Sequence, residues 1–165
     1  MNAYKPIKRN KAFVPFSKDH HFSLLLAWKI RQDVENKVKA EHVCSYVLGF
    51  FNDNLQQHFK EEEELIFCKL PTDDTLRKQA EDEHKKIYLL IESIRQNTSN
   101  KKFLKEFANM LEAHVRFEER TLFNHLQQNM KSEELEEVFL IVQENDDDGK
   151  HRKLFMSHKN TEGVQ

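Results

Sequence analysis

Two segments of the chain carry the same spacing of histidine and glutamate. His58 precedes Glu62 by four residues, and His114 precedes Glu118 by the same interval. On an α-helix, residues four apart point from one face, one turn from each other. The pairs run on into similar segments, Glu63-Glu64-Leu65-Ile66-Phe67 and Glu119-Arg120-Thr121-Leu122-Phe123. The repeat predicts two equivalent helices that each present an imidazole and a carboxylate to one side.

An acid-flanked histidine opens an apolar run upstream of each pair. These are Asp19-His20 before the first pair and Glu83-His84 before the second. The chain therefore contains two copies of one plan, a helix with a histidine followed by a helix with a histidine and a glutamate. Four such helices bring four imidazoles and two carboxylates to one core, which predicts a metal site.

Composition excludes several other classes of protein. The length of 165 residues suits one domain, and 33% charged residues with a net charge of −2 argue against nucleic acid or an anionic membrane as the main partner. No run approaches the ~20 apolar residues of a membrane span, and the N-terminus holds lysines but no apolar signal region. Cys44 and Cys68 cannot form a disulfide framework. We expect a cytoplasmic protein.

The scarcity of helix breakers predicts an all-α fold. Only three glycines and three prolines occur. We expect residues 1–16 to form an extended N-terminal arm and residues 17–143 to form an up-down-up-down four-helix bundle with a short fifth helix. The expected helices span about 17–38, 41–69 and 75–96, a fourth from about 100, and the short one at 132–142. Residues 144–165 are expected as a polar, flexible tail.

Local signals predict the helix ends. Ser17 and Ser99 are the expected N-caps of the first and fourth helices, and the run Pro71-Thr72-Asp73-Asp74 ends the second helix and caps the third. Gly49, in the middle of the second helix, costs about 1 kcal/mol relative to alanine. It predicts a close approach of two helices.

The two pairs interrupt the apolar stripes of their helices, so folding would bury the carboxylates. A buried carboxylate costs several kcal/mol unless it is paired or bound to metal, and two facing each other would raise at least one pKa. The alternative is that each pair is a solvated surface contact, which is how we interpret the charges of Glu61, Glu63 and Glu64. That alternative requires both stripes to rotate away at the same point, so we favour the metal site.

The ligand types indicate which metal would bind. No cysteine lies among these candidate ligands, which disfavours a thiolate zinc site, whereas imidazole and carboxylate ligands in a four-helix bundle suit iron or manganese, with zinc possible. By symmetry, Glu62 and Glu118 each project between histidines of opposite halves. This predicts two ions that share the carboxylates and keep positions open for oxygen, peroxide, nitric oxide or hydroxide.

At these residues the sequence resembles the hemerythrin family of His-His-Glu cation-binding domains. The resemblance covers about residues 16–128, and residues 17–28 and 58–64 are especially similar to its bacterial branch. It implies a non-haem di-iron centre bridged by two carboxylates and an oxo or hydroxo group. Residue by residue, the implied metal ligands are His20, His58, Glu62, His84, His114 and Glu118.

The chain departs from the oxygen-carrying members at two positions. Those proteins place another histidine one turn before the third-helix ligand, where this chain has Ala80. They also have an aspartate five residues past the fourth-helix histidine, where this chain has Glu119. We expect Glu118 to be the ligand, because it repeats the spacing of Glu62. Because Ala80 cannot bind metal, the ion held by His84 and His114 would be one ligand short of the oxygen-carrier pattern. That shortage favours sensing or chemistry over oxygen storage.

Two further residues leave alternatives open. The stripe that begins at His20 stays apolar along its helix, whereas the stripe from His21 reaches Arg31 or Gln32. His20 is the expected ligand, and His21 is the alternative or a donor to a bridging carboxylate. Tyr88, one turn past His84, could lie near the position that Ala80 leaves, although packing is its expected role.

The resemblance and the ligand set predict a di-iron protein that binds or senses oxygen or a related small ligand, or handles iron under oxidative or nitrosative stress. One alternative is a di-iron enzyme that reduces peroxide or nitric oxide. Another is an iron-dependent module whose surface is recognised by a protein partner.

Overall fold

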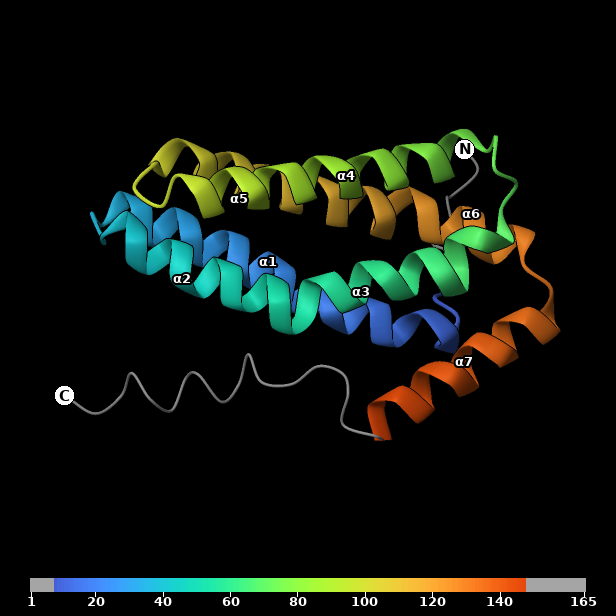
Figure 1. Ribbon diagram of the computed structural model, residues 1–165. Helices are drawn as coiled ribbons and strands as arrows, with labels where there is room; N and C mark the ends of the chain where they lie inside the picture. The colour runs from blue at the N-terminus through green and yellow to red at the C-terminus, as the bar shows by residue number, and fades with distance from the viewer. Residues whose placement is uncertain (1–7, 148–165) are drawn as a thin grey trace, which may run out of the picture.

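Long antiparallel helices form the molecule (Figure 1). The computed structural model describes residues 8–147. The first and third long helices are α1 (Val14–Glu35) and α4 (Thr75–Gln96). The second combines α2 (Ala40–Phe50) and α3 (Gln56–Glu61) across a π-turn at Phe51–Leu55, and ends with a π-turn at Glu62–Ile66 and a 3-10 turn at Phe67–Lys69. The fourth combines α5 (Lys101–Phe117) and α6 (Phe123–Asn129) across a π-turn at Glu118–Leu122.

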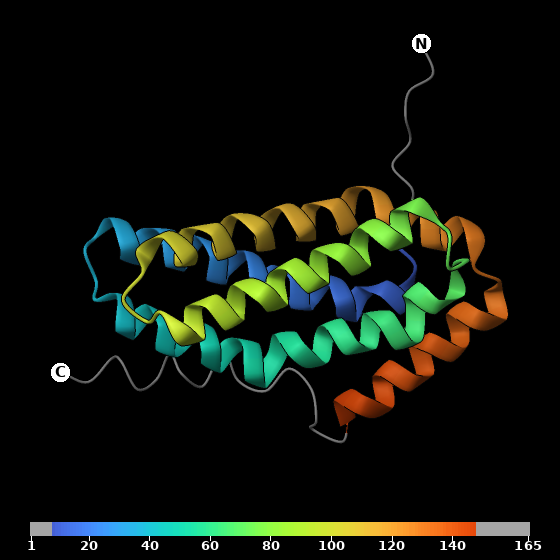
Figure 2. The same cartoon turned by 45° about the horizontal axis from the view of Figure 1, so that its top comes forward.

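These four helices run up, down, up and down, as Figure 2 shows from a second side. A shorter helix, α7 (Ser132–Asp147), packs across one end of the bundle. The predicted all-α four-helix bundle with a short fifth helix is confirmed. Among the described residues, no helix is long and apolar enough to cross a membrane.

Side-chain caps set two of the helix starts. The Asp74 carboxylate accepts hydrogen bonds from the amides of Leu76 and Arg77 at the start of α4, both at 3.0 Å. Asn100 caps α5 by accepting from the amide of Lys102, so the expectation of Ser99 was wrong by one residue. An asparagine side chain makes the same cap as a serine, and the backbone turns one residue later than we expected.

The expectation of an extended N-terminal arm was wrong for residues 11–16. A helical turn at Lys11–Phe13 leads into α1, which begins three residues before Ser17. Phe13 and Phe16 are fully buried, and both rings pack against Phe123 of α6. Burying these rings stabilises an early start of the helix. Residues 1–7 of the expected arm lie outside the described residues.

The C-terminal helix is longer than expected. It begins at the predicted Ser132 but continues to Asp147, into the segment we expected as a tail. Val138 and Val142 are buried, and the Asn145 amide donates to the Glu61 carboxylate at 3.1 Å. Glu61 is therefore a buried contact between helices and not the surface charge that we expected. Residues 148–165 lie outside the described residues.

The core consists of two apolar clusters with a polar layer between them. On α1, for example, Phe16 belongs to one cluster and Leu26 to the other, with His20 between. On α4, Ala80 and Ile87 flank His84 in the same way. The same order along each long helix places the predicted ligands at one level of the bundle.

Candidate metal centre

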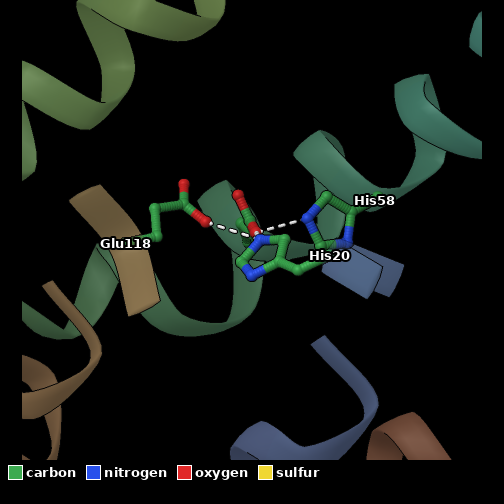
Figure 3. Close-up of side chains that lie close together, drawn as sticks. His20, His58 and Glu118 are labelled. Carbon is green, nitrogen blue, oxygen red and sulfur yellow. Dashed lines mark hydrogen bonds and ion pairs between the residues drawn. The ribbon is translucent and has the colours of Figure 1, made fainter. Parts of the chain in front are cut away.

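All six predicted ligands are at most 3% exposed. Each long helix supplies one histidine, and the two glutamates begin the π-turns that follow α3 and α5. His20 is buried whereas its neighbour His21 is exposed, so the structure places His20 and not His21 in the core. Figure 3 shows the imidazoles of His20 and His58 and the carboxylate of Glu118 turned toward one another.

The six side chains form two adjoining groups, each with ligand atoms within 4.8 Å of one another. Both groups contain Glu62 and Glu118. The first group adds His20 and His58, and the second adds His84 and His114. Each group therefore holds two imidazoles and shares two carboxylates with the other.

The carboxylate oxygens of the shared glutamates divide between the groups. Glu62 Oε1 lies 3.2 Å from His20 Nε2, and Glu62 Oε2 lies 3.1 Å from His84 Nε2. Glu118 Oε2 lies 2.9 Å from His20 Nε2, and Glu118 Oε1 lies 2.7 Å from His114 Nε2. Each glutamate thus presents one oxygen to each group, so a cation held in each group would share both carboxylates.

Several of these buried atoms make no hydrogen bond, which fits metal binding. They are Nε2 of His58 and of His114 and both carboxylate oxygens of Glu118. Each of these nitrogens lies close to a carboxylate oxygen of the site, and each of these oxygens lies close to an imidazole nitrogen, but without hydrogen-bond geometry. Buried polar atoms are normally satisfied, and imidazole nitrogen and carboxylate oxygen are both metal ligands. A cation in each group would satisfy them, so the residues present fit the predicted metals.

The other ring nitrogen of every histidine bonds to an outer carboxylate. The Nδ1 atoms pair at 2.6–2.9 Å as follows: His20 with Glu119, His58 with Asp19, His84 with Glu63, and His114 with Glu83. Because an ionised carboxylate only accepts, each Nδ1 carries a proton and donates it outward. Each Nε2 faces the site, where a bound cation would take the place of a second proton.

This outer layer of carboxylates was not expected from the sequence. Glu63 was expected to be a surface charge, but its carboxylate accepts from His84 Nδ1 at 2.8 Å while remaining partly in solvent. Each outer carboxylate is the immediate sequence neighbour of a ligand, and that adjacency was the available signal.

Ion pairing controls protonation in the site. Burial lowers the pKa of His58, but the carboxylates of Glu62 and Asp19 outweigh it and raise that pKa to about 9. Burial and the charge of Glu118 raise the pKa of Glu62, but His58 and His20 lower it to about 2. His114, His20 and His84 likewise outweigh burial and lower the pKa of Glu118. The expectation that at least one carboxylate pKa is raised was therefore wrong, because four imidazoles surround the two carboxylates.

Aromatic rings fix the planes of the imidazoles. His20 stacks on Phe123 with centroids 5.3 Å apart, and His84 stacks on Phe67 at 5.4 Å. Phe67 and Phe123 hold the same position in the sequence repeat, nine residues after His58 and His114. Phe59 adds a second stack on His84, at 3.9 Å.

The two halves of the repeat, α1 to α3 and α4 to α6, differ one turn before their first histidines, His20 and His84. Phe16 precedes His20 by four residues, and its ring meets the His58 ring edge-on at 6.1 Å. Ala80 precedes His84 by four residues and is also buried. Tyr88 packs edge-on against Phe59 and Phe51, as its expected packing role requires. At this position the first half has a phenyl ring and the second half has only a methyl group.

Comparison with known proteins agrees with this geometry. A family model described as the hemerythrin HHE cation binding domain matches residues 18–126, a stretch that holds all six residues. Neither curated proteins nor solved structures give a match. The matched stretch covers more than half of the chain and contains the two groups of potential ligands. The chain therefore belongs to the hemerythrin family of HHE cation-binding domains.

Proposed function

We propose that this chain holds two iron ions in the paired groups and uses them to bind or sense oxygen or a related small ligand. The observation that carries the proposal is the division of the Glu62 and Glu118 oxygens between the two groups. A pair of shared carboxylates with two imidazoles on each side suits two iron or manganese ions better than one ion. Bound iron would supply redox chemistry and coordination positions for a diatomic or peroxide ligand.

We place the small ligand beside His84 and His114. At this group the chain has Ala80 where oxygen-carrying members of the family have a histidine, and where the other half has Phe16. The alanine methyl group cannot coordinate a cation, as the histidine of those members can. An incoming ligand therefore need not displace a protein group. Phe59 and Phe67 flank the imidazole of His84 and keep its plane fixed.

A position without a protein ligand favours fast exchange over long retention. For this reason we propose sensing, or the handling of iron under oxidative or nitrosative stress, rather than oxygen storage. The alternative is an enzyme that reduces peroxide or nitric oxide. It differs from the sensor in needing sustained turnover with an electron donor.

Metal analysis and oxygen mixing test the proposal. Elemental analysis should find about two iron ions per chain after reconstitution; no bound transition metal would refute the metal assignment. Stopped-flow mixing of the ferrous protein with oxygen should then give rapid autoxidation. Ala80→His should slow autoxidation by filling the open position, whereas Lys78→His on the exposed side of α4 should not.

Oxygen mixing and a turnover assay together separate the functions. An optical signal of the oxygen-exposed wild type that persists for hours would make storage the correct function. Sustained consumption of peroxide or nitric oxide with a reductant would assign an enzyme.

A further inference from the structure

The outer carboxylates form a closed ring around the bundle. We define them as Asp19, Glu63, Glu83 and Glu119, each next in sequence to a metal-site residue. On every long helix the outer carboxylate bonds a histidine of the following helix, and the fourth helix bonds back to α1. The bonds are Asp19 to His58, Glu63 to His84, Glu83 to His114 and Glu119 to His20.

This ring gives every histidine the same orientation. Carboxylate–histidine–metal arrangements fix the tautomer and make the imidazole a stronger donor to the metal. The four bonds lie between 2.6 and 2.9 Å, within the range of charge-assisted hydrogen bonds. All four Nε2 atoms are thus directed inward by carboxylates that themselves do not reach the two groups.

The ring also adds negative charge. With Glu62 and Glu118, six carboxylates lie in or around the site, whereas two divalent ions carry only four positive charges. Arg9, 3.3 Å from Glu119, offsets part of the surplus. The side chains of Asp19 and Glu83 are only 12% and 16% exposed, so solvent screens them incompletely.

We propose that the outer carboxylates are positioning residues that bias the centre toward trivalent ions and so favour its oxidised form. The inference rests on the proposed function, because it concerns the iron ions held by the two groups. It assigns to this chain's own acids, which the family pattern of ligands does not include, control over the valence of the bound metal.

Isosteric substitutions separate charge from orientation. Glu83→Gln and Asp19→Asn keep an oxygen that can accept from Nδ1 but remove the negative charge. Glu64→Gln is the matched control, since Glu64 is exposed and, within residues 8–147, makes no hydrogen bond to a histidine of the site; its neighbour Glu63 makes that bond instead. Iron content is measured first, and the midpoint potential of the iron-loaded protein is then measured by spectroelectrochemical titration.

Each ring substitution should change the ferrous-to-ferric ratio about tenfold toward ferrous at a fixed potential. For a one-electron step this is an upward shift of about 59 mV. The control should titrate like the wild type. In zinc-loaded protein, nitrogen-15 spectra should show His114 Nδ1 protonated in both wild type and Glu83→Gln, because the amide oxygen still accepts.

Failure of this inference is distinct from failure of the proposed function. A wild type that binds no iron overturns the proposed function. Wild-type iron content with an unshifted potential in both ring variants overturns the inference alone. A shifted potential accompanied by loss of the Nδ1 proton in Glu83→Gln also overturns it, because orientation and not charge would then set the potential.

Discussion

Glu62 and Glu118 are the residues on which the pairing of the two groups depends. Both are fully buried, and each directs its two oxygens to different groups. Glu62→Gln or Glu118→Gln removes a negative charge shared by both ions while keeping the side chain's size. We expect at least one of the two ions to be lost in each variant, as measured by elemental analysis after reconstitution.

The control for this measurement must be an exposed acid outside the ring. Glu64→Gln meets that condition, whereas Glu61 bonds Asn145 and Glu63 bonds His84. Equal metal content in Glu62→Gln, Glu118→Gln and the control would contradict the bridging role.

Residue by residue, the sequence predicts which side chains converge in the core better than it predicts their outer partners. The repeat of His58 and Glu62 at His114 and Glu118 identifies residues that share a helix face, which depends only on helical geometry. The bond from Asp19 to His58 joins two helices at a distance that only their packing determines. The partners of the ligands therefore could not be predicted from spacing alone.

At the scale of elements, the long helices followed from their periodicity but their ends did not. The bounds of α4 agree with the predicted range of 75–96. The run Pro71-Thr72-Asp73-Asp74 before it and Asn97 after it both stop a helix. The start of α1 differs because Phe13 and Phe16 are buried against Phe123, more than 100 residues away in sequence. A local cap signal at Ser17 cannot compete with that burial.

Gly49 provides a prediction about α2. The expected close approach of helices is wrong, because a Cβ atom at this position would meet nothing within 4 Å. Gly49→Ala should therefore raise the free energy of unfolding by about 0.5–1 kcal/mol, since glycine loses more backbone entropy in a helix. Thermal or denaturant unfolding measures the change.

A neighbouring exposed position supplies the control. Ser45 is exposed and lies in the same helix. Ser45→Ala changes the helix propensity by less than Gly49→Ala does, so it should stabilise the protein less. A lower melting temperature for Gly49→Ala would show that the glycine has a structural role.

Across the whole molecule, the site is a polar layer that separates the two apolar clusters and joins all four long helices. Its carboxylates and imidazoles are oppositely charged partners: burial opposes ionisation of Glu62, but His58 and His20 outweigh that effect and lower its pKa. We therefore expect the metal-free protein to fold. Cations held by ligands from all four helices would bind the native state and not the unfolded chain, so they should stabilise the whole bundle.

Removal of metal tests this coupling. At free metal about 1,000-fold above the dissociation constant, binding to the native state adds about 4 kcal/mol to the free energy of unfolding. For a chain of this size that corresponds to a melting temperature higher by on the order of 10 °C. Chelation should lower the melting temperature of the wild type by this order, with metal removal confirmed by elemental analysis. Chelation of Glu62→Gln should have a smaller effect, because that variant starts with less metal. An unchanged wild-type melting curve would mean that the bound metal does not join the helices, and the ions would then have to lie outside the polar layer.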